Sequence, residues 1–272
     1  DLLFGDVNPS GKLAETFPRR LEDNPSYLYF FGDEQNKTEY REGVFVGYRY
    51  YDKKNMDVLF PFGYGLSYTT FEYSNLTLDK SEMNDTDTLT VSVNVRNTGK
   101  VKGKEVVQLY VGMPESRTIR PVKELRGFEK IELEPGEEKT VTFTLEKRAF
   151  AYYRTDISDW HVESGDYTIM AAKSSRDIAC TATVNVTSTT QIKRVYTMNS
   201  TIEEIMESPV GREILGKMMA QNPLAQADAD DIGMGEAMAR MMAEMPLRAL
   251  LSFGGDSVPA GAGEMLLKQL NA

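Results

Sequence analysis

The chain is 272 residues long, which is room for about two domains of 100–150 residues that bury cores without a disulfide or metal staple. Its 41 acidic and 31 basic residues give a formal net charge of −10, which argues against a protein that binds nucleic acid or anionic membranes. One cysteine excludes an intrachain disulfide, and one histidine excludes a multi-histidine metal site.

No apolar run approaches the ~20 residues that cross a bilayer. The sequence starts at Asp1, without a signal-peptide pattern, and we expect it to be a piece of a longer protein.

Residues 1–68 are rich in turns and aromatic side chains. A turn signal stands at 8–11, a short strand ended by proline is expected at 13–18, and aromatic runs occupy 27–31 and 44–51. We find no amphipathic helix and no set of alternating strands here. We therefore interpret this segment as the end of a domain whose bulk lies elsewhere.

Residues 69–187 predict an antiparallel β-sandwich. Apolar and polar residues alternate in several short segments, separated by turn signals at spacings of roughly ten residues. Cys180 falls on an apolar strand face, where it acts as a small buried hydrophobe. The expected strands are 88–95, 106–111, 140–145, 167–171 and 178–186, and the turns are 97–99, 134–136 and 164–166.

Residues 188–272 predict a small all-α extension of three to five short helices. Ser200 with Glu203, and Thr201 with Glu204, fit the capping-box spacing, and Ser208-Pro209 fits a second helix start. Ten of the fourteen methionines lie here, several at helical spacing. Core packing or docking against the parent protein is the favoured interpretation, with a peptide-binding groove as the alternative.

Several local patterns resemble functional motifs but do not support a catalytic, metal-binding or dinucleotide-binding site. Ser67 lacks the final glycine and the strand-turn-helix setting of a nucleophile elbow. His161 is expected to be an ordinary polar strand residue. Asp228–Gly233 resembles the start of a calcium loop, but Ala239 stands where the bidentate acid is needed. The glycines at 63–65 do not open a helix after a strand, so no dinucleotide site is expected.

Longer motifs resemble family 3 glycoside hydrolases, and most closely the bacterial β-glucosidases. They occur in the order of the family over residues 1 to about 187. The motifs are DVNPSGKL at 6–13 with TFP at 16–18, YREGVFVGYRYYD at 40–52, FPFGYGLSYTTF at 60–71, GKEVVQLYV at 103–111, RPVKELRGF at 120–128 and LEPGE at 133–137.

The resemblance implies a (β/α)-barrel domain with the nucleophilic aspartate, an α/β sandwich domain with the acid/base glutamate, and a fibronectin type III-like domain. Residues 1–68 resemble the end of the α/β sandwich domain and 69–187 the fibronectin-like domain, followed by the Met-rich helical extension at 188–272. The fold class is thus mainly β. Retaining hydrolysis needs two carboxylates about 5–5.5 Å apart, and neither is expected in this chain. We expect no cofactor and no metal.

Two acidic residues stand out against this background. Asp159 lies in a Ser-Asp-Trp triplet like that of the family's nucleophile, but it precedes a late strand of the sandwich, so we interpret it as a turn residue and Trp160 as packing. Glu42 is not where the resemblance places the acid/base. We expect Glu42, Tyr48 and Arg49 to have a substrate-rim or interface role, with Glu42 available to pair with an arginine.

Two functions of different class follow. In the first, the chain is the C-terminal part of an enzyme that hydrolyses terminal β-linked sugars; it braces the missing barrel and α/β domains and takes part in homodimer contacts. In the second, it is a stand-alone carbohydrate-binding or interaction module without catalysis. Its stacking aromatics would then be Tyr27, Tyr29, Tyr48, Tyr50 and Tyr51.

The sequence says less about the cellular compartment of the protein and about the sugar that the parent enzyme takes. A single cysteine and the lack of a visible export signal slightly favour the bacterial cytoplasm over secretion. Glucose, xylose and a broader range of sugars all fit, because the pocket that selects them is expected outside this chain.

Overall fold

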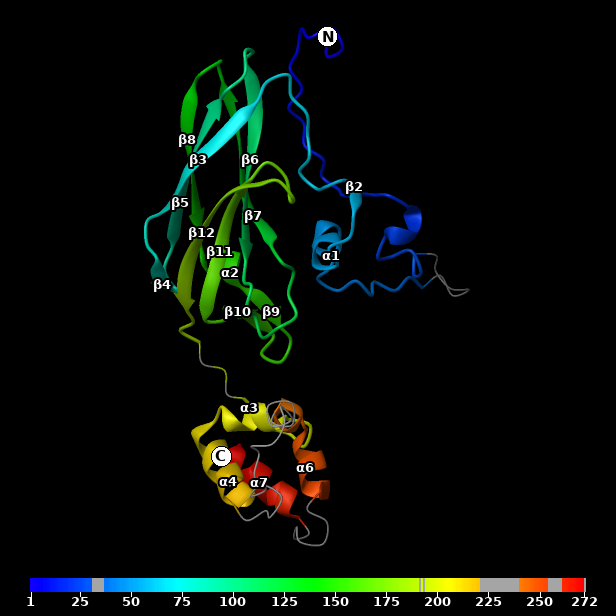
Figure 1. Cartoon of the computed structure of the whole chain (residues 1–272), viewed down its shortest axis with the longest axis vertical. Helices are drawn as coiled ribbons and strands as arrows, with labels where there is room; N and C mark the ends of the chain where they lie inside the picture. Colours follow the sequence, from blue (N-terminus) through cyan, green and yellow to red (C-terminus); the bar gives the residue numbers. More distant parts are fainter. Residues whose placement is uncertain (31–36, 191, 193, 221–239, 254–260, 272) are drawn as a thin grey trace, which may run out of the picture. The chain divides into compact units, whose positions relative to one another are not determined.

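The structure is a computed structural model that describes residues 1–30, 37–190, 192, 194–220, 240–253 and 261–271. The chain forms two compact units, Asp1–Gln191 and Ile192–Ala272, each of which is described by itself (Figure 1). Residues 1–68 and the strands that follow them belong to the first unit.

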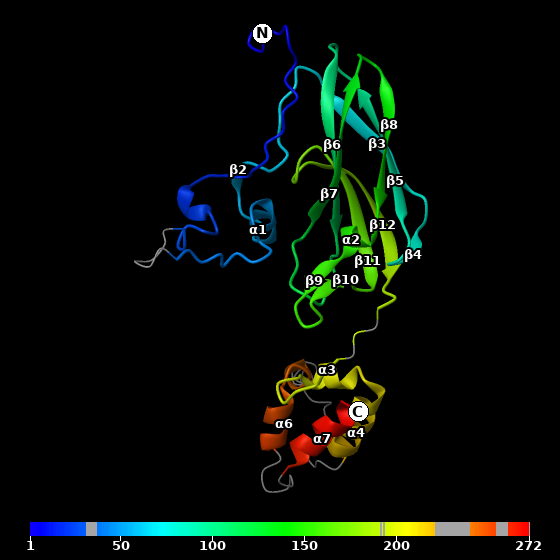
Figure 2. The same cartoon turned by 180° about the vertical axis from the view of Figure 1, so that it is seen from behind.

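Two β-sheets form most of the first unit (Figures 1 and 2). The larger sheet has the order β4-β12-β11-β6-β7, and the smaller has the order β3-β5-β8. Neighbouring strands run antiparallel, apart from β4, which pairs in parallel with β12. This arrangement confirms the predicted sandwich. The strands are β3 (Phe71–Leu78), β4 (Glu82–Asn84), β5 (Leu89–Asn97), β6 (Gly103–Gly112), β7 (Glu124–Leu133), β8 (Glu138–Leu145), β11 (Gly165–Ala172) and β12 (Ile178–Thr187).

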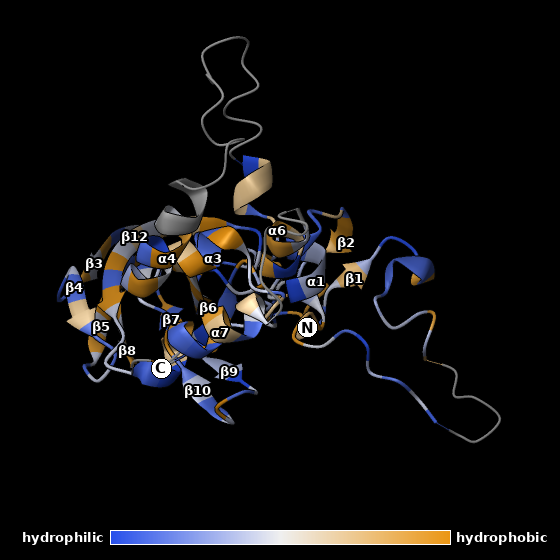
Figure 3. Cartoon of the chain, turned by 90° about the horizontal axis from the view of Figure 1, so that it is seen from below, coloured by the Kyte–Doolittle hydropathy of each residue, from blue (hydrophilic) through white to orange (hydrophobic). Residues whose placement is uncertain are grey.

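The core lies between the two sheets and is built from the predicted alternation. In β5, every second side chain from Leu89 to Val95 is fully buried, and the residues between them face solvent to varying degrees. Val107 and Leu109 of β6 and Ile169 of β11 belong to the same buried cluster. Figure 3 shows this alternation as hydrophobic and hydrophilic bands along β3 and β5. A period of two places one set of side chains on the buried face of a sheet.

Strands β3 and β7 were not expected from the pattern, for two different reasons. In β3, Phe71 and Tyr73 are buried, but an irregularity between Ser74 and Thr77 shifts the inward set to Leu76 and Leu78. The alternation therefore changes phase, and neither half is long enough to recognise. In β7, an edge strand, both faces are partly covered, so its burial shows no period.

A short hairpin follows helix α2 (Lys147–Phe150) and consists of β9 (Tyr152–Arg154) and β10 (Asp159–His161). The turn between the strands covers 155–158, and Ser158 adopts a φ of 52°. The expectation of a turn at Asp159 is therefore wrong by one residue, because this aspartate already pairs with Arg154 in the ladder. His161 is a half-buried strand residue, as expected, and burial lowers its pKa.

The N-terminal segment contains β1 (Phe17–Pro18), the 3-10 turn η1 (Leu21–Asp23), helix α1 (Tyr48–Lys53) and β2 (Val58–Phe60). Only the last two residues of the strand expected at 13–18 form β1, which pairs with β2. The expectation of no helix is wrong at α1. Six residues cannot form a stable helix by propensity, and this helix exists because its buried tyrosines pack against other parts of the unit.

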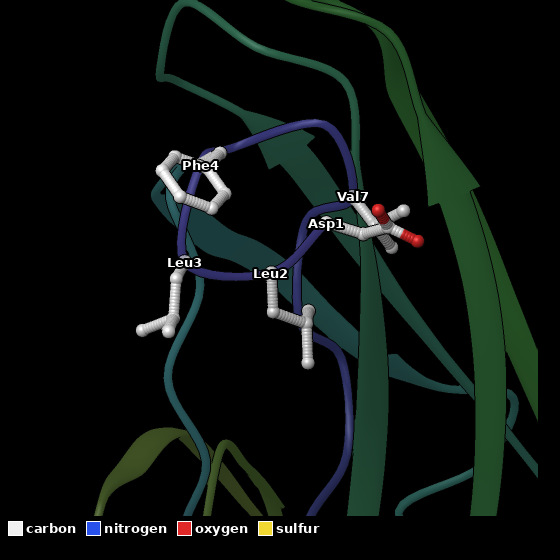
Figure 4. A pocket seen from close by; sticks show the side chains of 5 residues that line it. All are labelled: Asp1, Leu2, Leu3, Phe4 and Val7. Atoms are coloured by element: carbon white, nitrogen blue, oxygen red, sulfur yellow. The ribbon is translucent and has the colours of Figure 1, made fainter.

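Large apolar side chains remain exposed along this segment. The first residues form a loop whose hollow is lined by Asp1, Leu2, Leu3, Phe4 and Val7 (Figure 4). Leu3 is 93% exposed and Phe4 is 88% exposed. Farther along, Leu28, Tyr40 and Leu66 are also exposed. Such side chains are typical of a surface that another part of a protein covers.

The second unit is helical, as predicted. Thr201 caps the first helix through a capping box with Glu204, and the next helix starts at Pro209, where Ser208 accepts a hydrogen bond from the Gly211 amide. A separate apolar cluster includes Ile205, Leu215, Leu247, Leu266 and Leu270. The helices described over their full length are α3 (Ile202–Met206), α4 (Pro209–Ala220), α6 (Leu247–Phe253) and α7 (Ala262–Leu270).

Two expectations for this unit lie outside the described residues: the acidic run Asp228–Gly233, and the part of the methionine pattern at Met234 and Met238. No helix within the described ranges is long and apolar enough to cross a membrane.

Asp85 anchors the chain where it leaves β12. Its side chain is fully buried; Oδ1 accepts hydrogen bonds from the Thr189 amide at 2.9 Å and hydroxyl at 2.6 Å, and Oδ2 lies 2.9 Å from Lys147 Nζ. Burial alone would raise the pKa of Asp85, but the Thr189 hydrogen bonds and the Lys147 ammonium outweigh it and lower the pKa. The ionised form is therefore the one that the fold stabilises.

We expect Asp85→Asn to reduce the free energy of unfolding of the sandwich at pH 7 by about 1.5–3 kcal/mol. Because the folded-state pKa is lowered, the carboxylate stabilises the fold above its unfolded-state pKa and loses this effect as pH falls through the folded value. Urea denaturation at several pH values should therefore show a deficit that shrinks below about pH 4. A constant deficit down to acid pH would contradict this, and Asp57→Asn on the surface is the control.

Candidate functional site

The N-terminal segment meets the sandwich along a polar seam, defined here by Lys12, Tyr48, Arg49, Asp52 and Gly63 on one side and by Glu105, Gln108, Lys123, Glu124, Leu125, Lys173 and Arg176 on the other. Two of the three site residues predicted from the sequence, Tyr48 and Arg49, lie in this seam.

Asp52 is the centre of the seam. It lies in α1 with its side chain only 4% exposed. Oδ2 is 2.8 Å from Lys123 Nζ, and Oδ1 accepts a hydrogen bond from Arg176 Nε at 2.9 Å. Arg176 also donates to the Met56 carbonyl at 2.8 Å, immediately after the helix. One buried carboxylate therefore joins α1 to two separate parts of the sandwich. We refer to Asp52, Lys123 and Arg176 as the Asp52 clamp.

Tyr48 forms the apolar part of the same contact. Its ring stacks on Phe62 at 4.7 Å and meets Tyr110 edge to face at 6.0 Å. The Tyr48 hydroxyl accepts a hydrogen bond from the Leu125 amide at 2.8 Å. Tyr110 is fully buried and donates to Gln108 Oε1 at 2.7 Å, and burial raises the pKa of Tyr110. These tyrosines therefore serve as neutral packing and hydrogen-bonding groups.

Gln108 connects three chain segments. Its Nε2 donates to the Gly63 carbonyl at 3.0 Å and to the Lys173 carbonyl at 2.7 Å. The side chain is 2% exposed, so these bonds satisfy a buried amide. Gly63 has a φ of 78°, and a Cβ there would overlap the amide of Gln108. Glycine at this position is thus required by both backbone conformation and close approach.

Two further ion pairs complete the seam. Lys12 Nζ lies 3.1 Å from Glu105 Oε1, and both side chains are largely buried. The hydroxyl of Tyr73 donates to the same oxygen at 3.1 Å, and burial with the adjacent carboxylate raises the pKa of Tyr73. In the second pair, Arg49 lies 3.5 Å from Glu124.

The paired side chains of the seam hold two parts of the first unit together, and they do not form a catalytic arrangement. Asp52, Glu105 and Glu124 each lie within ion-pair distance of at least one basic side chain. A retaining glycosidase needs one carboxylic acid and one carboxylate facing each other across an open sugar site. Within the described ranges, no group of three His, Cys, Asp or Glu residues is placed to hold a metal ion.

The predicted site residues separate in the structure. Tyr48 and Arg49 lie in the seam. Glu42 lies in the turn 41–44, half-buried, with its carbonyl accepting a hydrogen bond from the Phe45 amide. Of the two arginines that the sequence left open as partners for Glu42, Arg41 pairs with Glu39 and Arg49 pairs with Glu124. A substrate-rim role for these three residues stays a prediction.

The remaining candidates have structural partners. Ser67 Oγ donates to Asn8 Oδ1 at 3.0 Å. The turn expected at 8–11 is wrong, because the turn in this part of the chain covers residues 2–5. Asp159 Oδ1 accepts from the Trp160 amide at 2.7 Å. The five tyrosines considered for sugar stacking are buried or half-buried; they are Tyr27, Tyr29, Tyr48, Tyr50 and Tyr51.

Sequence reasoning did not single out Asp52, Lys123, Arg176 or Gln108 as seam residues. Asp52 and Lys123 occur inside family-like motifs, at 40–52 and 120–128, but a motif does not reveal which of its residues meet. Gln108 gave a local signal, since it is the one polar residue within the apolar run 106–111.

Family models match both parts of the first unit. Residues 1–68 match the glycosyl hydrolase family 3 C-terminal domain, and residues 105–175 match a fibronectin type III-like domain. The chain is also 51% identical, over its whole length, to thermostable β-glucosidase B of Acetivibrio thermocellus, of which it covers 36%. The chain belongs to glycoside hydrolase family 3. The resemblance inferred from the sequence motifs is thereby confirmed.

Other relatives and solved structures agree in the extent of the match. The exo-α-(1→6)-L-arabinopyranosidase of Bifidobacterium breve is 42% identical over 94% of this chain and 33% of its own length. The crystal structure of a Bifidobacterium adolescentis GH3 β-glucosidase superposes with a TM-score of 0.68 at 42% identity, covering 79% of this chain and 31% of that one. For Kluyveromyces marxianus β-glucosidase in complex with glucose, the TM-score is 0.64 at 46% identity, covering 69% and 22%.

The chain thus spans about a third of the length of the first curated relatives it matches, and residues 1–68 match a C-terminal domain model.

Proposed function

We propose that this chain is the C-terminal part of a β-glucosidase-type enzyme that hydrolyses terminal β-linked sugars with retention, through two carboxylates that lie outside this chain. The observation that carries the proposal is the 51% identity with a thermostable β-glucosidase over the whole chain. The seam agrees with it, because its buried carboxylates are all held by cations and none is placed as a free acid/base.

The role of this portion in the proposal is to hold the end of the α/β domain in place. The Asp52 clamp and Tyr48 fix α1 on the sandwich, while Leu28, Tyr40 and Leu66 leave an apolar surface for the rest of that domain. A β-linked oligosaccharide is the proposed substrate. The proposal also includes contacts between two copies of the enzyme in a homodimer. It places the enzyme in a reducing compartment, because the chain has a single cysteine.

The test is a chimera in which this chain replaces the matching C-terminal part of the Acetivibrio thermocellus β-glucosidase. Hydrolysis of aryl β-glucoside, aryl β-xyloside and aryl α-L-arabinopyranoside is measured for the chimera and for this chain alone. The last substrate is included because two relatives are named arabinopyranosidases. We expect an active chimera and an inactive chain, with light scattering giving the oligomeric state.

Two results would contradict the proposal. A folded chimera without activity on any of the three substrates would show that this chain does not support a family 3 hydrolase. Turnover by the chain alone, with an intact mass matching 272 residues, would place catalysis within it. Loss of that turnover in Asp159→Asn would then assign the Ser-Asp-Trp triplet a catalytic role.

A further inference from the structure

The hairpin β9–β10 has one face turned toward the sandwich and one turned away. On the inner face, the Tyr152 hydroxyl accepts a hydrogen bond from the Thr118 hydroxyl at 3.2 Å, and the Arg120 guanidinium lies 5.2 Å from the centre of its ring. Tyr153 and Trp160 are directly opposite each other in the ladder and fall on the outer face. They are 50% and 38% exposed.

The two outer rings form an ordered pair. Their centroids are 5.4 Å apart with an interplanar angle of 71°, which is an edge-to-face contact. The guanidinium of Arg148, an exposed residue of α2, lies 3.1 Å over the ring of Trp160. Asp159 pairs with Arg154 in the ladder and therefore falls on the inner face, the same face as Tyr152 and His161. The outer face therefore combines two fixed aromatic rings with one exposed hydrogen-bond donor, the Arg148 guanidinium.

The size of this surface argues against a second protein as its occupant. A fully buried aromatic side chain covers about 150–250 Å², so the exposed halves of two rings offer roughly 200 Å². A stable protein interface needs about 800 Å² from each partner. The hairpin is also bordered by charged side chains, Arg154, Asp156 and Asp159, of which the first two pair with each other. A small ligand with apolar faces and polar edges fits these features better.

A β-linked glucopyranose has that chemistry. Its hydroxyls are equatorial, so both faces of the ring present C–H bonds, which are attracted to the negative face of an aromatic ring. The hydroxyls at its edge accept hydrogen bonds, as the Arg148 guanidinium requires because it can only donate. A few polar groups around an aromatic wall fix the orientation of such a ligand.

We propose that Tyr153, Trp160 and Arg148 form an auxiliary binding site for β-linked gluco-oligosaccharides on the outer face of the β9–β10 hairpin. The sugar packs on the exposed part of the Tyr153 ring, beside Trp160, and the Arg148 guanidinium binds its hydroxyls. The choice of a β-linked ligand rests on the proposed function. Binding at the hairpin needs no turnover, so it is measured independently of hydrolysis.

Trp160 is the only tryptophan in the chain, so its fluorescence reports on this site alone. We titrate the 272-residue chain with cellotetraose and, in parallel, with the α-linked maltotetraose. The expected result is a saturable change in Trp160 emission with cellotetraose, with half-saturation on the order of 1 mM, and at least a tenfold weaker response to maltotetraose. Tyr153→Ala and Arg148→Ala should each weaken cellotetraose binding about tenfold.

Phe128→Ala is the matched control, because Phe128 is an aromatic residue 66% exposed on β7, away from the hairpin ladder. It should leave the titration unchanged. No saturable response to either sugar, in a chain shown to be folded by near-UV circular dichroism, would overturn the site. Equal responses to both sugars, or responses that survive both hairpin variants, would also overturn it. None of these three results would affect the chimera assay, so failure of the site and failure of the proposed function are distinguishable.

Discussion

Replacing Asp52 by asparagine should detach helix α1 from the sandwich without unfolding the sandwich itself. The substitution keeps the shape of the side chain but leaves Lys123, whose side chain is only 11% exposed, without its counter-ion. Breaking a buried ion pair in this way costs about 3–5 kcal/mol, because the remaining charge stays desolvated. Arg176 is more exposed and can be solvated, so most of the cost is expected at Lys123.

The measurement is hydrogen exchange at the Leu125 amide, which donates to the Tyr48 hydroxyl and so reports docking of α1 directly. We expect its opening free energy to fall by about 3–5 kcal/mol, while urea unfolding of the sandwich, followed by Trp160 fluorescence, changes little. Asp52→Asn combined with Lys123→Met should recover part of the loss, since no unpaired buried ammonium remains.

Lys104→Gln is the control, because it removes an exposed ion pair and not a buried one. Lys104 lies 3.3 Å from Glu132, and both side chains are about half exposed. Such a surface pair contributes about 0–1 kcal/mol, so Leu125 exchange should be unaffected. Leu125 exchange in Asp52→Asn that matches the unsubstituted chain would mean that Tyr48 packing alone holds the seam.

The second large effect is expected for Gly65→Ala. The carbonyl of Leu13 accepts from the Gly63 amide, and the carbonyl of Tyr64 accepts from the Leu13 amide, both at 2.8 Å, so the two chain segments lie close together. A Cβ on residue 65 would overlap the backbone carbonyl of Gly11. Backbone cannot move aside as a side chain end can, so the segments must separate and lose these hydrogen bonds. We expect a loss of about 3 kcal/mol in the docking of the N-terminal segment.

Gly11→Ala is the matched control for this substitution. It adds the same methyl group to the other member of the close contact, where a Cβ would meet nothing within 4 Å and where φ is not left-handed. It should be neutral, or stabilising by about 0.4–1 kcal/mol through reduced freedom of the unfolded chain. Limited proteolysis of residues 1–68 compares the two variants. Equal cleavage rates would show that the segments tolerate separation at Gly65.

Both substitutions also test whether docking of the N-terminal segment is needed for the activity of the proposed enzyme. In the chimera, Asp52→Asn and Gly65→Ala should lower activity by releasing the end of the α/β domain, although neither residue is expected to touch substrate. Full activity in a chimera with an undocked α1 would mean that the sandwich does not brace the catalytic part.

Several features of this protein were determined by the sequence alone. The period-two pattern of β5, β8 and β11 identifies a half-buried antiparallel sheet, because successive side chains of a strand must face opposite sides. The Thr201–Glu204 spacing identifies a helix start, because a capping box joins atoms within one turn. The ordered motifs over 1–187 identified the family, because each motif is a long string of specific residues.

The tertiary structure alone decided the rest. Helix α1 has no periodic signal of its own and is held by Tyr48 and Asp52, whose partners lie far along the chain; Arg176 is 124 residues from Asp52. The change of phase in β3 depends on a bulge opposite β5, and the exposure of Trp160 depends on which face of a hairpin meets the sandwich. A local pattern reports the period of one element. Which charges meet, and which rings stay in solvent, is fixed only when distant segments pack together.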